Sequence, residues 1–103
     1  MLKIPDNLKI GPLVYKVILA EVLTDEETKE RLWGEISYEH RAISLADGEK
    51  QTQFASLVHE ALHALMEITG INLSESKVHA LAYALFGFYR DNPELFPGWQ
   101  ELS

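Results

Sequence analysis

An unbroken helical repeat of apolar residues in the second half of the chain constrains the fold more than any other feature. From about Lys50, apolar residues follow the spacing i, i+3, i+4, i+7, i+8, i+11, i+12. This spacing predicts one long amphipathic helix with a single buried face. Thr69-Gly70 should end it, because glycine readily takes the left-handed conformation that closes a helix. The residues expected to face the core are Phe54, Leu57, Val58, Ala61, Leu62, Leu65 and Met66.

A second helix is expected to follow directly. Asn72 or Ser74 can cap its first turn, and Glu75 stands three residues after Asn72, as in a capping box. Asn92-Pro93 should end this helix, because the residue before a proline is driven out of helical geometry. The two helices are therefore predicted to form a hairpin. The expected buried stripe of the second helix is Val78, Leu81, Ala82, Leu85 and Tyr89, and Phe96 and Trp99 in the tail should pack back on the body.

The first half of the chain has the period of two that is typical of strands. Pro12–Ala20 is rich in β-branched and aromatic residues and predicts a strand. Leu32–Tyr38 and Arg41–Leu45 alternate around Glu39-His40, which predicts a hairpin. Thr24–Arg31 is expected to be a polar connection. We therefore expect a single α+β domain over residues 1–103, in which a small antiparallel or mixed sheet packs on the helical hairpin.

Composition excludes several classes of function. The net charge of −7 on 103 residues repels phosphate, so neither a nucleic acid nor an anionic membrane is an expected partner. The apolar runs are far shorter than the roughly 20 residues of a membrane span. The chain has no cysteine and begins without an apolar leader segment, so we expect a cytoplasmic protein. Its oligomeric state cannot be read from these features.

The motif His59-Glu60-Ala61-Leu62-His63 lies in the middle of the first predicted helix. A spacing of four places both imidazoles on one face, where they can bind a single Zn²⁺. Glu60 can then act as general base toward a metal-activated water. With 4 His and 12 Glu in 103 residues, a chance HExxH is expected about 0.02 times. We therefore interpret the motif as a metal site.

A catalytic zinc site needs a third protein ligand. If the helices form an antiparallel hairpin, both rise about 1.5 Å per residue, so the residue level with His63 is near position 80. His79 is therefore the favoured third ligand. Glu75 is the alternative, since it shares a helix face with His79 and lies one turn nearer the hairpin turn.

The segment from Gln51 to Ala64, preceded by Trp33–Tyr38, resembles small bacterial and phage metallopeptidases of the ImmA/IrrE type, which are minimal zincins. In that family a later helix carries a Glu-Ala-Asn-x-Phe-Ala pattern whose glutamate is the third metal ligand. His79–Ala84 is similar to that pattern, with histidine in place of the glutamate. The resemblance also implies that the edge strand before the helix, here Arg41–Leu45, aligns a peptide substrate by β-augmentation.

The sequence therefore predicts a zinc-dependent peptidase, with Zn²⁺ held by His59, His63 and His79 and with Glu60 as its general base. Its partner would be a protein or peptide substrate. The alternative is a non-catalytic, zinc-stabilised binding or regulatory protein, such as a phage-encoded regulator. Tyr83 is a further candidate as an oxyanion donor, although a tyrosine at the edge of the core is the commoner arrangement. His40, in the predicted hairpin turn, is expected to be solvated.

Overall fold

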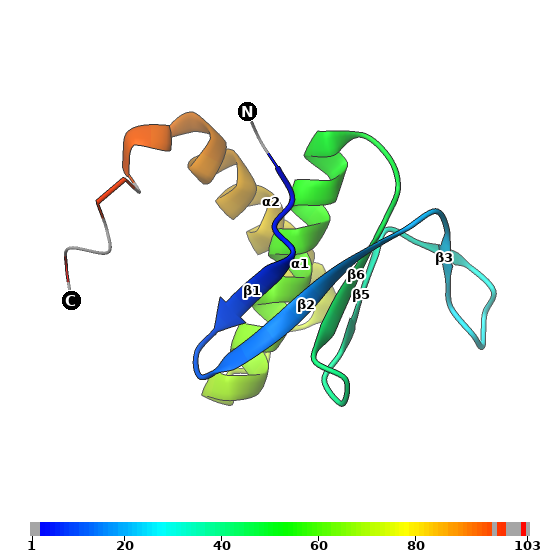
Figure 1. Ribbon diagram of the computed structural model, residues 1–103. Helices are drawn as coiled ribbons and strands as arrows, with labels where there is room; N and C mark the ends of the chain where they lie inside the picture. The colour runs from blue at the N-terminus through cyan, green and yellow to red at the C-terminus, as the bar shows by residue number, and fades with distance from the viewer. Residues whose placement is uncertain (1–2, 96, 99–101, 103) are drawn as a thin grey trace.

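A four-stranded mixed sheet forms one layer of the molecule (Figure 1). The computed structural model describes residues 3–95, 97–98 and 102. The strand order is β1-β2-β6-β5, with β1 at Asn7–Ile10, β2 at Leu13–Ala20, β6 at Ala42–Ala46 and β5 at Gly34–Ser37. The β1–β2 and β5–β6 pairs are antiparallel, and β2 and β6 are parallel. The strand in Pro12–Ala20, the hairpin around Glu39-His40 and the α+β fold class are confirmed.

The β6 strand lies inside the sheet, hydrogen-bonded to β2 on one side and to β5 on the other. The prediction that Arg41–Leu45 is an edge strand able to receive a peptide is therefore wrong. The parallel pairing of β2 with β6 explains the difference, because it fills the edge that a hairpin alone would leave open. β5 is the free edge on this side of the sheet.

The connection between β2 and β5 contains short strands that the sequence did not predict. β3 (Leu23–Thr24) and β4 (Arg31–Leu32) pair in a separate two-stranded sheet. At its tip, the Asp25 carboxylate accepts hydrogen bonds from the backbone N–H groups of Glu27 and Thr28, which lower its pKa. β1 was also missed, because four residues with two apolar side chains give too short an alternation to recognise.

The helices are α1 (Lys50–Thr69) and α2 (Glu75–Asp91), and a short 3₁₀ helix follows at Pro93–Leu95. Gly70 closes α1 with φ of 74°, as the sequence predicts. Ser74 caps α2, because its Oγ accepts a hydrogen bond from the N–H of Lys77. α1 packs on the sheet, whereas α2 packs chiefly on α1. The predicted helical pair on a small sheet is confirmed.

The core lies between the sheet and α1, but the predicted apolar stripes are only partly buried. On α1 the buried residues include Leu57 and Ala64, whereas Leu65 is 43% exposed. On α2 only Val78 and Ala82 are buried, because this helix touches the body along one narrow face. The core cluster consists of Ile4, Ile10, Tyr15, Ile43, Leu45, Leu57 and Ala64.

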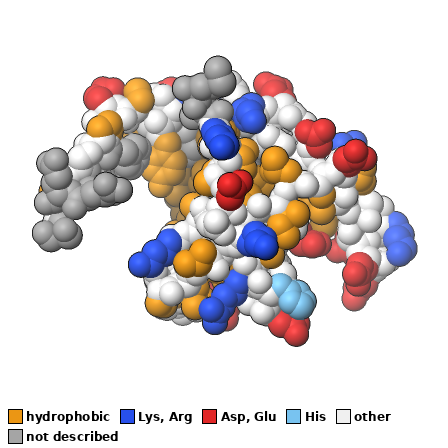
Figure 2. Space-filling model, viewed as in Figure 1, with side chains coloured by type: hydrophobic (Ala, Val, Ile, Leu, Met, Phe, Trp, Pro, Cys, Tyr) orange, Lys and Arg blue, Asp and Glu red, His pale blue; other side chains and the backbone are white. Residues whose placement is uncertain are grey.

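Six of the remaining stripe residues border a groove of about 210 Å³ between the helices and β1: Val58, Ala61, Leu62, Leu65, Leu85 and Tyr89. Figure 2 shows hydrophobic side chains gathered in the hollow between the body and the outer part of α2. Phe96 and Trp99 lie outside the described residues. Among the residues that are described, no helix has the length and hydropathy to cross a membrane.

Two glycines with positive φ give a matched stability prediction. Replacing Gly70 (φ +74°) by alanine should destabilise the protein by about 1–2 kcal/mol, because its Cβ would meet nothing within 4 Å and only the left-handed backbone is penalised. Gly11→Ala should cost slightly more, because at φ +58° its Cβ would also lie 2.7 Å from Cδ1 of Ile68, and the end of that side chain would have to rotate away. Urea denaturation of the two variants checks the order; equal losses would contradict the contact with Ile68.

Candidate metal centre

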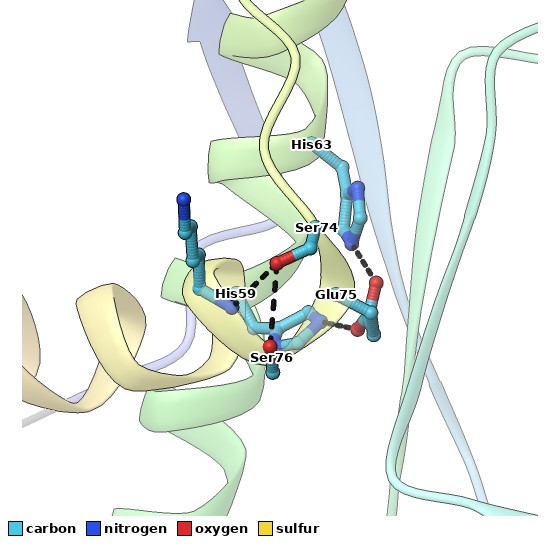
Figure 3. Close-up of polar contacts among 6 residues, drawn as sticks. His59, His63, Ser74, Glu75 and Ser76 are labelled. Carbon is cyan, nitrogen blue, oxygen red and sulfur yellow. Dashed lines mark hydrogen bonds and ion pairs between the residues drawn. The ribbon is translucent and has the colours of Figure 1, made fainter.

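Two histidines of α1 and one carboxylate of α2 converge on one point (Figure 3). His59 and His63 lie one turn apart, and their Nε2 atoms contact different oxygens of Glu75, at 2.7 Å to Oε1 and 3.1 Å to Oε2. The candidate ligand atoms of the three residues all lie within 4.8 Å of one another. Both imidazoles are largely covered, with side chains 18% and 22% exposed. This group could hold a metal ion.

The path of the chain between the two helices places Glu75 at the level of His59 and His63 along α1. No helix or strand is assigned to residues 70–74, and the Ser74 backbone is extended, with ψ of 156°. Extended chain rises about 3.3 Å per residue, about twice the rise of a helix. From Gly70 the chain therefore returns to the level of His59 and His63 within roughly five residues.

His79 does not belong to the group that could hold a metal. Among the described residues, that group consists of His59, His63 and Glu75, the alternative to His79 as third ligand. The His79 ring centroid lies 6.0 Å from that of His59 and 4.8 Å from that of Tyr83. The prediction of a ligand near position 80 assumed two helices joined by a tight turn. The extended segment 70–74 instead brings the chain level with His59 and His63 already at Glu75.

Glu60 is only 7% exposed and lies beside the histidines, on the side of α1 that faces β5. Burial raises its pKa to about 7, and the charges of Glu75 and Glu35 add to the shift. The backbone of β5 approaches it closely, since a Cβ on Gly34 would lie 3.1 Å from its Oε2. Glu60 is therefore a carboxyl group able to exchange a proton near neutral pH.

A cavity of about 220 Å³ opens beside the metal group. Its walls come from the first half of α1, from the start of β5 and from α2. The lining residues are Trp33, Gly34, Thr52, Ala55, Ser56, His59, Glu60, His79, Ala82 and Tyr83. Glu60 and one metal-competent histidine thus face the same space, which is the arrangement that a hydrolytic site requires.

The structure brings His59, Glu60 and His63 together as their spacing predicts, and places His79 and Tyr83 on the opposite wall of the cavity. His40 is exposed in the β5–β6 turn, where its backbone N–H donates to Oγ of Ser37. Sequence reasoning missed the contribution of Gly34. The signal that could have found it is a glycine inside a strand pattern, because such a glycine often marks a place where another group approaches the strand backbone closely.

Comparisons with known proteins give no assignment: no family model matches the sequence, and neither a curated protein nor a solved structure matches it. The evidence for function therefore comes from the residues of the site itself.

The raised pKa of Glu60 predicts a pH-dependent stability of the metal-free protein. The folded state holds this proton more tightly than the unfolded state, where the ordinary value is 4.5. The contribution of Glu60 is therefore complete below pH 4.5 and is lost as pH rises to about 7, by roughly 3 kcal/mol. Urea denaturation from pH 4 to 8 in the presence of a chelator measures this loss.

Glu60→Gln supplies the control, because it keeps the shape of the side chain and removes the titration. As pH rises from 4.5 to 7, the wild type should lose stability relative to the variant, because only the wild type has the titrating carboxyl group. A difference that does not change with pH would contradict the raised pKa.

Proposed function

We propose that this protein is a zinc-dependent peptidase in which His59, His63 and Glu75 hold the metal and Glu60 is the general base. The observation that carries the proposal is the position of Glu60. A metal that only stabilises a fold needs no buried carboxyl group beside its ligands and facing an open cavity. A hydrolase needs such a group, with a pKa near the working pH. The pKa of about 7 at Glu60 meets that need.

The donor set supports zinc. Two imidazoles and one carboxylate are the ligand set of many catalytic zinc sites, in which the fourth position stays open for water. His59 and His63 present Nε2 toward Glu75, so small side-chain movements would allow these atoms to surround one ion. When bound, zinc would supply a Lewis acid that activates a water molecule and polarises a carbonyl group. The proposal also agrees with the resemblance of the HExxH segment to ImmA/IrrE-type enzymes.

Glu60 would perform both proton transfers of the reaction. Its carboxylate takes the proton of the attacking water as the oxygen adds to the peptide carbonyl carbon. The same group then gives that proton to the leaving nitrogen as the C–N bond breaks. Burial favours this sequence, because it stabilises the protonated form and the carboxyl group therefore holds a proton near neutral pH.

The free edge of β5 offers a way to align the substrate. Trp33 and Gly34, at the beginning of this edge, line the cavity next to Glu60. An extended peptide that pairs with β5 would therefore run past the general base. The Trp33 side chain is 51% exposed and provides an apolar contact at the mouth. We accordingly propose an extended peptide or an exposed protein segment as substrate.

The ligand set predicts opposite effects of two substitutions on metal binding. Glu75→Ala should weaken zinc binding by more than about 100-fold, because loss of a mere supporting partner already costs 10- to 100-fold. His79→Ala should retain about one zinc per chain. Competition with a chromophoric chelator measures both affinities, and circular dichroism checks that the helices persist. Retention by Glu75→Ala with loss by His79→Ala would overturn this ligand set.

The general base gives a second prediction. Glu60→Gln should bind zinc as tightly as the wild type, while cleavage of a proteome-derived peptide library falls by about 10²- to 10⁴-fold. Mass spectrometry of the library reads the cleavage, and zinc content is measured on the same samples. Cleavage that survives in Glu60→Gln would overturn its role. Failure of the zinc-loaded wild type to cut any peptide would instead favour the non-catalytic binding protein.

A further inference from the structure

The middle of α2 carries no charge on any side. Charged residues make up 24% of the chain, yet none of the twelve residues from Val78 to Tyr89 is Asp, Glu, Lys or Arg. Only Val78 and Ala82 of this helix are buried. A helix at the surface of a soluble protein ordinarily carries polar residues opposite its buried face, whereas a helix that is apolar all round is covered. α2 therefore presents an apolar face that nothing in the described chain covers.

The outer face of α2 lies opposite Val78 and Ala82. At 100° per residue its centre is formed by Ala80 and Ala84, with Gly87 at its margin, where this glycine also lines a cavity against the beginning of α1. Larger apolar side chains flank this centre: Leu81 is 40% exposed, Tyr83 59% and Phe88 47%. In Figure 1 the second half of α2 extends away from the sheet.

We propose that a second copy of this chain covers the outer face, with α2 packed antiparallel on α2 about a two-fold axis through Ala84. In this arrangement a residue n positions before Ala84 faces the residue n positions after it on the second copy. Four positions away, Phe88 lies on Ala80, and three positions away, Leu81 lies on Gly87. Each large side chain thus meets a small one, which lets the two helices approach closely.

The charges at the two ends of the outer face, Lys77 and Asp91, complement those of a second copy. A chain of net charge −7 repels itself, so two copies can meet only where acidic groups are absent, as on this face. The nearest charges on the same face are Lys77 and Asp91, each seven residues, or two turns, from Ala84. The two-fold axis therefore sets Lys77 of each copy against Asp91 of the other.

The proposed interface borders the cavity beside the metal group through Tyr83. Tyr83 flanks the outer face and also lines the cavity that contains Glu60. Two copies joined through α2 therefore place the second molecule beside the mouth of this cavity. The proposal does not depend on peptidase activity, because it rests on the surface of α2 alone.

Sedimentation equilibrium of the full chain tests the interface directly. One face of a helix of 17 residues buries less area than the about 800 Å² per partner of a standard interface. We therefore expect weak association, with a dissociation constant of roughly 10–100 μM. Ala84→Glu should weaken the dimer at least about tenfold, because it places two like charges on the axis. Ala84 is exposed, so this variant should fold as the wild type does.

Val22→Glu is the matched control, since it adds the same charge at an apolar side chain that is 61% exposed and lies far from α2 in the sequence. It should leave the dimer intact. A wild-type protein that stays monomeric up to about 500 μM would overturn the proposal. A dimer that Ala84→Glu does not weaken would overturn it equally, since the copies would then meet elsewhere.

Charge reversal tests the antiparallel register. Lys77→Glu and Asp91→Lys should each weaken the dimer, whereas the double variant should restore it, because the two contacts exchange their signs. Each single change also suits the helix dipole, because it places a negative charge near the beginning of α2 or a positive charge at its end. Weaker association would therefore not result from unfolding of α2. Failure of the double variant to recover association would exclude this register.

Discussion

The contact of the Glu75 carboxylate with His59 and His63 joins the first turn of α2 to α1, and the candidate metal group depends on it. Glu75 is the first residue of α2, and the only buried side chains of this helix, Val78 and Ala82, follow within two turns. α2 is therefore held at its beginning, while Leu85 and Tyr89 in its second half border the groove that Leu8 of β1 also lines. The cavity exists because this end of α2 is fixed beside α1 and forms one of its walls.

The same placement controls the chemistry of Glu60. α1 presents this side chain between β5 and α2, where burial and the acidic groups nearby favour the protonated form. A positive ion held by Glu75 and the histidines would oppose that effect and favour the carboxylate. With a metal ion bound, Glu60 would therefore be under two opposing influences on its protonation, as the proposed role of a base that takes and returns a proton requires.

Periodicity predicted the two long helices, the strand in Pro12–Ala20 and the hairpin, because each depends mainly on local spacing and on turn residues. Periodicity did not predict how little of α2 is buried, because the exposure of an apolar stripe depends on which other elements pack against it. The third ligand illustrates the same limit. Sequence spacing identified both His79 and Glu75, but only the path of residues 70–74 decides which of them meets His59 and His63.

Among the residues that the structure describes, the large side chains that are almost fully buried are Tyr15, Ile43, Leu45 and Val78. Three of these belong to the sheet, so the attachment of α2 draws little on the hydrophobic core. Small domains commonly supplement a limited core with a metal or with association between copies. α2 is suited to both, because its first turn carries a metal-competent carboxylate and the middle of its outer face is uncharged.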